Sequence, residues 1–261
     1  MNQPKPVLQV VKIGGNVIDN PKALADFLRL FATLKGPKVL IHGGGKIATQ
    51  LAKDLGIEST MIEGRRVTDK SSLRIVTMVY AGWINKSIVA TLQALGCTSL
   101  GLSGPDGGIV QAKKRNPVPI DYGFVGDIEK VNGRALAQLI EAGYAPIFAP
   151  ITTDETGQLL NTNADTMAQA LSIALSDFYQ VNLVYCFEKA GVLLDPNDDD
   201  SVIPSINAAY FEELKSNGIV TAGMIPKLEN ALKAISKGVH LVRLCLADHL
   251  LSEDLGTNIQ P

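Results

Sequence analysis

Two glycine-rich segments of this chain each follow an apolar run and carry a lysine. The first reads KIGG and contains Lys12, and the second reads HGGGK and contains Lys46. Glycine loops that follow strands expose backbone N–H groups, which bind phosphate together with the positive end of a following helix. The two segments therefore predict a crevice for anions at the carboxyl ends of two neighbouring parallel strands.

The spacing within the second segment by itself favours a dinucleotide. Gly43, Gly45 and Ala48 fit the pattern G-x-G-x-x-A, and Glu63 lies about twenty residues further on, where a ribose ligand is expected. An NAD-dependent oxidoreductase is therefore one hypothesis. That hypothesis gives no role to Lys12, because a plain dinucleotide fold needs one glycine turn and no lysine at its rim.

Three further segments carry polar groups suited to the same crevice. GRRVT contains Arg66, whose guanidinium could hold a carboxylate with two hydrogen bonds, although such arginine pairs are more often only solvated. NTNAD supplies Asn161, Asn163 and Asp165 directly before a helical pattern, which is more than one helix cap requires. GMIPK places Lys227 at a helix start, where a cation is disfavoured unless it faces an anion.

Strands of a mostly parallel sheet must position these groups. Apolar runs of strand length alternate with helical patterns, and runs that are apolar on both faces indicate a sheet covered by helices on both sides. The sequence therefore predicts an α/β fold, a three-layer α/β/α sandwich. The predicted strands cover residues 7–13, 38–42, 98–103, 145–151, 181–187 and 239–246.

Helix caps and hairpins complete this plan. Asn20 is expected to cap one helix, Thr68 or Asp69 a second, and Asn163 or Asp165 a third. Residues 58–68 and 109–131 are predicted hairpins that form walls of the site. The long helical segment over residues 69–95 holds the only tryptophan, Trp83, which suits either a core helix or a contact with a second subunit.

Composition narrows the class of partner. The chain has 261 residues, 46% of them hydrophobic and 19% charged, with a formal net charge of -2. This balance argues against nucleic acid and anionic membranes as partners. The three cysteines, Cys97, Cys186 and Cys245, lie in apolar runs and are expected to be buried thiols of a reducing compartment. With no leader pattern and no apolar run of about 18 residues, a soluble cytoplasmic protein is expected.

Taken in this order, KIGG, HGGG, GRRVT, NTNAD and GMIPK, followed by LGTNI near the C-terminus, resemble the amino-acid kinase superfamily over nearly the whole chain. The resemblance is greatest to its members that act on N-acetyl-L-glutamate. It implies the amino-acid kinase (carbamate kinase-like) fold, with a substrate-binding and dimerising lobe at residues 1–178 and an ATP-binding lobe at 179–261. The implied reaction transfers the γ-phosphoryl group of MgATP to the side-chain carboxylate of N-acetyl-L-glutamate, in arginine biosynthesis.

The resemblance also implies roles for individual residues. Lys12 and Lys227 match the pair that stabilises the transferring phosphoryl group, and Asp165 matches the aspartate that orients them. On the substrate side, the resemblance assigns Gly44, Gly45, Arg66 and Asn161. On the nucleotide side, it assigns Gly14, Gly15, Asn163 and Gly191.

The remaining implied features concern the metal and the assembly. Mg²⁺ would be held mainly by the nucleotide phosphates, with no metal site of the protein. A homodimer through the long central helix is implied. Because few residues precede the first predicted strand, the helix that links arginine-inhibited hexamers in the family is not expected.

Two alternatives stay open within the resemblance. The segment CFEKAG has Glu188 where many relatives have aspartate, and Ala222 stands where an aspartate is frequent, which leaves the adenine contacts undetermined. A regulatory subunit that binds nucleotide without catalysis is therefore a further hypothesis. The acyl group is also open, since N-succinyl-L-glutamate would need only a roomier pocket.

Overall fold

A central eight-stranded sheet organises the chain in the computed structural model, which describes residues 4–62, 65–195, 197–220 and 224–260. The strand order is β12-β14-β13-β11-β1-β2-β8-β5, and the six strands from β13 to β5 are parallel, while β14 and β12 run the opposite way at one edge. The strands are β1 (Val7–Ile13), β2 (Lys38–His42), β5 (Ser99–Leu102), β8 (Ala145–Phe148), β11 (Gln180–Phe187), β12 (Ser205–Ile206), β13 (Leu241–Leu246) and β14 (Thr257–Ile259).

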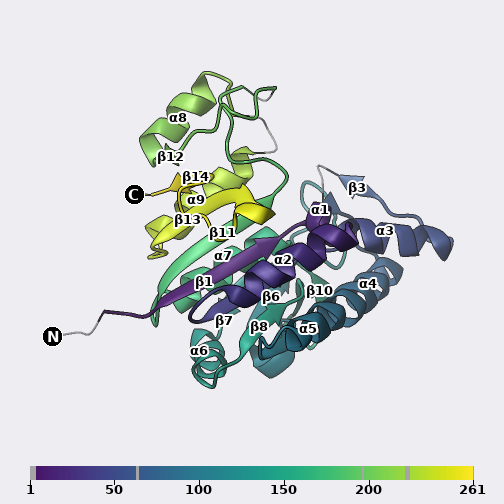
Figure 1. Ribbon diagram of the computed structural model, residues 1–261. Coiled ribbons are helices and arrows are strands. Elements are labelled where there is room, and N and C mark those ends of the chain that lie inside the picture. The colour runs from purple at the N-terminus through teal and green to yellow at the C-terminus, as the bar shows by residue number, and fades with distance from the viewer. Residues whose placement is uncertain (1–3, 63–64, 196, 221–223, 261) are drawn as a thin grey trace.

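Helices cover both faces of this sheet and bury one apolar core on each side. In Figure 1 the elements from β12 to β14, in green and yellow, lie at one end of the sheet, and α4 and α5 lie at the other. The predicted three-layer α/β/α architecture is confirmed. One face carries α1 (Gly15–Ile18), α2 (Pro21–Thr33), α3 (Gly45–Asp54), α4 (Lys70–Val76) and α5 (Asn85–Ala94), and the other carries α6 (Gly133–Glu141), α7 (Ala164–Leu175), α8 (Ala208–Ser216) and α9 (Ile225–Ser236).

The predicted helix caps are present. Asn20 accepts hydrogen bonds from the N–H groups of Lys22 and Ala23 at the start of α2, and Asp69 accepts one from Ser72 at the start of α4. These side chains satisfy donors that have no partner within the helix. The sequence therefore places both helix starts correctly.

A π-helical segment, η1 (Thr77–Ile84), joins α4 to α5, and nothing in the sequence predicts it. Together the three segments form a helix of 25 residues, Lys70–Ala94, long and apolar enough by composition to cross a membrane, a test that core helices also pass. Val76, Ile84 and Leu92 lie in the core of the chain. Trp83 is 71% exposed, so burial within this chain is excluded for the tryptophan.

Two small sheets lie beside the main one. A four-stranded sheet has the order β10-β9-β6-β7, and a hairpin joins β3 (Met61–Ile62) to β4 (Arg65–Arg66), so the predicted hairpins are confirmed. The larger sheet comprises β6 (Val110–Lys114), β7 (Gly126–Val131), β9 (Ile151–Thr153) and β10 (Leu159–Asn161), and short 3₁₀ turns occur at η2 (Asp106–Gly108) and η3 (Ala247–His249).

One predicted strand is wrong in extent. The apolar run over residues 145–151 divides into β8, which ends at Phe148, and β9, which belongs to the four-stranded sheet. Pro150 lies between them and has no N–H to donate, so the chain leaves the main sheet there. The break carries the chain toward the segment that holds Asn161 and Asp165.

Candidate active site

The two glycine turns lie side by side at the carboxyl ends of β1 and β2. Ile13 pairs with His42 across these strands, and the N–H of Gly43 donates to the carbonyl of Ile13 at 3.2 Å. The first turn leads into α1 and the second into α3, whose N-cap is Gly44. The two turns thus adjoin at the carboxyl edge of the sheet, and α3 begins directly after the second, so its N-terminus lies there as well.

Two lysines and an aspartate meet beside these turns. Lys12 comes from the end of β1, and its Nζ lies 2.7 Å from Oδ1 of Asp165, in the first turn of α7. Lys227, in the first turn of α9, donates from Nζ to Oδ2 of the same carboxylate at 3.0 Å. Three residues that lie far apart in the sequence therefore form one cluster, with each lysine on a separate carboxylate oxygen.

The electrostatics of the cluster keep the aspartate ionised. Burial by itself would raise the pKa of the Asp165 carboxyl, but the two lysines outweigh burial and lower the pKa to about 2. The position of Asp165 in the first turn of α7 also suits an anion. The carboxylate is therefore a permanent anion that holds two ammonium groups close together near neutral pH.

The second glycine turn forms one wall of a hollow of about 210 Å³. This hollow brings together all four residues that the family resemblance assigns to the substrate side. They are Gly44, Gly45, Arg66 and Asn161, and Asn163 joins them. Ala164, which directly precedes Asp165, also lines the hollow, so the hollow lies close to the lysine cluster.

Arg66 is fixed to the second turn rather than solvated. Its guanidinium donates to the carbonyl of Gly45 at 2.9 Å, to the hydroxyl of Thr49 at 2.7 Å and to the hydroxyl of Ser59 at 2.9 Å. The side chain is almost fully buried. A guanidinium has five N–H donors, so these three bonds orient it and leave donor capacity for a ligand in the hollow.

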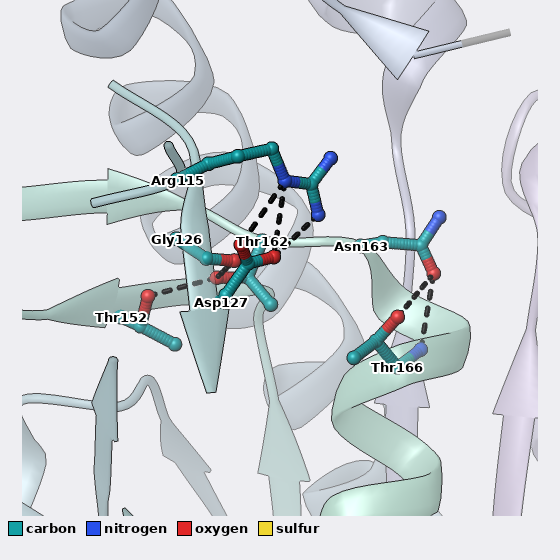
Figure 2. Close-up of polar contacts among 7 residues, drawn as sticks. All are labelled: Arg115, Gly126, Asp127, Thr152, Thr162, Asn163 and Thr166. Carbon is teal, nitrogen blue, oxygen red and sulfur yellow. Dashed lines mark hydrogen bonds and ion pairs between the residues drawn. The ribbon is translucent and has the colours of Figure 1, made fainter. Parts of the chain in front are cut away.

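The two asparagines of NTNAD have separate tasks. Asn161 ends β10 and donates from Nδ2 to the hydroxyl of Thr68 at 3.0 Å. Asn163 caps α7, with its side-chain oxygen accepting from the Thr166 N–H at 3.0 Å, as Figure 2 shows. Asn163, expected on the nucleotide side, lies in the same hollow as Arg66. Its proposed contact with the nucleotide therefore stays a prediction.

Sequence reasoning missed one charged residue that lines this hollow, Arg115, and its partner. Arg115 follows β6, and its Nε donates to Asp127 of β7 at 3.0 Å (Figure 2). The hairpin over residues 109–131 is predicted to form a wall, and the opposite charges on its two strands are the available signal for this pair. The register of the hairpin, which decides that these two side chains meet, cannot be read from the sequence.

Besides Asn163, the residues assigned to the nucleotide side lie in two further places. Gly14 and Gly15 form the first turn, and a Cβ on Gly14 would lie 3.4 Å from Nζ of Lys12. Gly191 lines a separate hollow of about 150 Å³ that also contacts Met224, the N-cap of α9. A Cβ on Gly191 would lie 2.6 Å from the Thr257 hydroxyl, so this glycine already has a packing role.

Of the two residues that depart from the family pattern, only Glu188 lies among the described residues. Glu188 accepts a hydrogen bond from the Asn16 side chain, just after the first glycine turn, so this residue contacts the site. Glu63 and Ala222 lie outside the described residues. The structure therefore tests neither the ribose contact of Glu63 in the dinucleotide hypothesis nor the departure from the family pattern at Ala222.

A larger hollow, of about 700 Å³, lies at the opposite edge of the sheet. It is lined by residues that precede strands, among them Pro6, Pro37 and Thr98. Ligands of parallel sheets bind at the carboxyl ends of strands, where the glycine turns and the lysine cluster lie. The smaller hollow is therefore the candidate substrate site.

Comparison with known proteins identifies the family. Residues 8–245 match the model of the amino acid kinase family. The chain is 54% identical to an acetylglutamate kinase of Cytophaga hutchinsonii over 94% of this chain and 93% of that one, and 51% identical to an acetylglutamate kinase of Bacteroides thetaiotaomicron over 97% and 98%.

A solved structure agrees on the fold. A carbamate kinase of Giardia has a TM-score of 0.69 to this chain at 13% identity and covers 99% of both chains. The match supports the predicted carbamate kinase-like fold and nothing finer. From the matched model and the close relatives, the chain belongs to the amino acid kinase family.

Proposed function

We propose that the protein is an acetylglutamate kinase, which transfers the γ-phosphoryl group of ATP to the side-chain carboxylate of N-acetyl-L-glutamate in arginine biosynthesis. The cluster of Lys12, Asp165 and Lys227 carries the proposal, because it lies beside two glycine turns and next to the hollow that Arg66 lines. The names of the close relatives support the choice of reaction and substrate.

Phosphoryl transfer requires that the two substrates be positioned and that positive charge lie near the transferring group. A side-chain carboxylate with an ordinary pKa of about 4.3 is already an anion near neutral pH, so it needs no general base before it attacks phosphorus. The transferring phosphoryl group gathers negative charge on its oxygens, and fixed cations and N–H dipoles stabilise that charge. The two lysines and the glycine turns supply both.

Asp165 acts in this proposal by fixing the lysines. Since its two oxygens each hold one ammonium group, within 3.0 Å, it sets the spacing between Lys12 and Lys227 before ATP binds. Cations fixed in advance cost no reorganisation when the charge develops. Lys12 and Lys227 would then flank the transferring group.

The substrate side holds the amino acid. Arg66 would bind the α-carboxylate and Asn161 the acylamino group, while the N–H groups of Gly44 and Gly45 face the reacting oxygens. Arg66 and Asn161 come from two different elements that line the hollow, β4 and β10, so a ligand that contacts both would be held in one orientation.

On the nucleotide side, Gly14 and Gly15 would face the ATP phosphates, with Gly191 and Asn163 as further contacts. We propose that Mg²⁺ is carried by those phosphates, where it neutralises part of their charge.

The proposal extends to the division of the chain and its assembly. Residues 1–178 would bind the amino acid and residues 179–261 the ATP, although one continuous sheet runs through both parts, with β1 paired to β11. A homodimer in the cytoplasm would form through the long helix, whose outer face exposes Met78 and Trp83. Light scattering of the wild type and of Trp83→Glu tests the dimer, and equal masses for both would contradict this interface.

The function is tested by trapping its product. The purified chain is incubated with MgATP, hydroxylamine and one of three acceptors, namely N-acetyl-, N-succinyl- or free L-glutamate. An acyl phosphate reacts with hydroxylamine to give a hydroxamate and phosphate, so hydroxamate formation separates transfer to a carboxylate from simple ATP hydrolysis. Fast turnover of the N-acetyl compound is expected, and faster turnover of the N-succinyl compound would correct the acyl group.

A matched pair of variants on α9 completes the test. Lys227→Ala should lower kcat by several orders of magnitude with little change in KM, because its contact strengthens mainly in the transition state. Lys233→Ala, exposed on the same helix, should retain wild-type kcat. Hydroxamate formation at equal rates in both variants would refute the assignment, as would tight NADH binding with no effect of ATP on the melting temperature.

A further inference from the structure

A histidine lies buried beneath the second glycine turn. His42 ends β2 and has no exposed surface. Its Nδ1 lies 2.9 Å from the carbonyl oxygen of Gly43, and its Nε2 lies 3.1 Å from the side-chain nitrogen of Asn85. The ring is thus held between the turn and the long helix.

These two contacts select one form of the ring. A carbonyl oxygen can only accept, so Nδ1 carries the hydrogen and donates to Gly43. The Asn85 amide is itself oriented, since its nitrogen donates to the carbonyl of Ile147 at 2.8 Å and its oxygen accepts from Lys86 at 3.1 Å. Asn85 therefore donates to Nε2, which is an acceptor only when the ring is neutral.

The surroundings keep the ring neutral. Burial lowers the pKa of His42 to about 4, the Gly43 carbonyl opposes that effect, and Lys86 adds to it. A proton on Nε2 would also confront the amide nitrogen of Asn85. The ring is consequently a fixed donor rather than an acid or base near neutral pH.

The hydrogen bond to Gly43 sets the direction of the next peptide N–H. The peptide between Gly43 and Gly44 is planar, with its N–H opposed to its C=O. Since the ring holds the carbonyl, the N–H of Gly44 must point the other way, away from the ring. Among the described residues no backbone carbonyl accepts from the N–H of Gly44 or Gly45, so both donors are available to a ligand in the hollow they line.

The π-helix explains how Asn85 reaches the ring. Asn85 directly follows η1, whose wider turns shift the residues after it relative to an α-helix. The same segment presses on the turn, because a Cβ on Gly44 would lie 2.3 Å from Cδ1 of Ile84 and 3.0 Å from Cδ1 of Tyr80. One face of the long helix thus supports the glycine backbone and anchors the histidine.

We propose that His42 and Asn85 are positioning residues for phosphoryl transfer, which hold the Gly43 carbonyl so that the Gly44 N–H faces the reacting groups. The inference rests on the proposed function for its kinetic consequence, although the ring form can be measured without any substrate. Neither side chain touches the reacting atoms. Their effect passes through the glycine backbone, so it concerns kcat more than the binding of either substrate.

The first experiment measures the ring form by ¹⁵N NMR. The chain has three histidines, and the His42 signals are assigned by their loss in a variant at that position. His42 should be the neutral form with hydrogen on Nδ1 and should titrate only near pH 4. A hydrogen on Nε2, or titration near the ordinary value of about 6.5, would overturn the proposal whether or not the chain is a kinase.

The second experiment compares two isosteric variants in the hydroxamate assay. In His42→Asn the amide nitrogen can occupy the place of Nδ1 and donate to Gly43, whereas in His42→Gln the amide lies near the place of Nε2. His42→Gln and Asn85→Leu should lower kcat by about 10- to 100-fold with KM for ATP unchanged, and His42→Asn should stay within a few-fold of the wild type.

The outcomes separate this inference from the proposed function. Wild type that forms no hydroxamate would refute the function, and the NMR result would still decide the ring form. Active wild type with an unchanged kcat in His42→Gln would overturn the positioning role alone. Equal losses of kcat in the two His42 variants, in step with equal falls in melting temperature, would show a merely structural role and would also overturn it.

Discussion

The two glycine turns look alike in the sequence but need their glycines for different reasons. In the first, Gly14 has φ −104°, and an added Cβ would meet only the end of Lys12. In the second, Gly44 has φ +150°, and an added Cβ would collide with Ile84. The space beside Gly14 is open except for that lysine end, whereas the space beside Gly44 is filled by the protein's own helix, so a glycine pattern does not by itself reveal what the glycine serves.

The lysines near the turns differ in the same way. Lys12 is 12% exposed and paired with Asp165, whereas Lys46, beside the second turn, is 72% exposed and lies 3.7 Å from Asp19. Exposed ion pairs contribute little, while a cation fixed beside a reacting group contributes much. Under the proposed function, Lys12, which precedes its glycines, is therefore the lysine that acts on the transferring phosphoryl group.

The largest expected effect tests this difference between lysines. Lys12→Met should lower kcat by about 10³-fold, the loss typical of removing a group that stabilises transition-state charge. Lys46→Met should stay within about threefold, since its contacts are exposed. Hydroxamate formation measures both rates, and similar losses in the two variants would show that the turns do not divide the work as described.

The next effect concerns the two glycines. Gly44→Ala should lower the free energy of unfolding by about 3 kcal/mol, because it combines overpacking against Ile84 with a backbone angle that L residues rarely adopt. Gly14→Ala should leave that free energy within about 1 kcal/mol. Urea unfolding provides the measurement, and comparable destabilisation by both substitutions would remove the contrast.

Arg66 tests whether the second turn also serves the substrate. Arg66→Ala should raise KM for the amino acid by about 100-fold, because it removes charged hydrogen bonds to a carboxylate, and should change KM for ATP little. Arg65→Ala, at the exposed neighbouring position of β4, is the matched control and should have a smaller effect. An unchanged amino-acid KM in Arg66→Ala would take this residue out of the site.

The smallest effect concerns the pH dependence of Asp165. Its pKa is lowered from 3.8 to about 2, so its charge stabilises the fold fully above about pH 4, and this contribution is lost as the pH falls toward 2. Asp165→Asn should therefore be less stable than wild type by roughly 2 kcal/mol at pH 7. Unfolding free energies measured from pH 7 downward should show a constant difference to about pH 4, and a difference that already disappears near pH 5 would contradict this account.

Much of the fold follows from the sequence because parallel strands buried on both faces must be continuous apolar runs. The predicted strands at residues 7–13 and 38–42 coincide with β1 and β2. Caps such as Asn20 are also legible, since a local hydrogen bond defines them. The meeting of Lys12 with Asp165 follows from the family resemblance rather than from periodicity.

The features that cannot be predicted from the sequence depend on strand register and on long-range packing. The π-helix leaves no mark in composition, because residues 77–84 are mostly apolar and would suit any buried helix. Arg115 and Asp127 meet only because the hairpin has one particular register. Asn163 shows a third limit, since capping and lining a site can fall on one side chain.

The outward face of the long helix gives the molecule a built-in optical reporter. Trp83 is the only tryptophan of the chain and is 71% exposed, while Tyr80 and Ile84 of the same π-helix lie against Gly44. Its fluorescence emission therefore originates from one known spot, on the helix that supports the glycine turn. If the proposed homodimer covers this spot, dilution should shift the emission to longer wavelength, so the proposed association can be tested without any label.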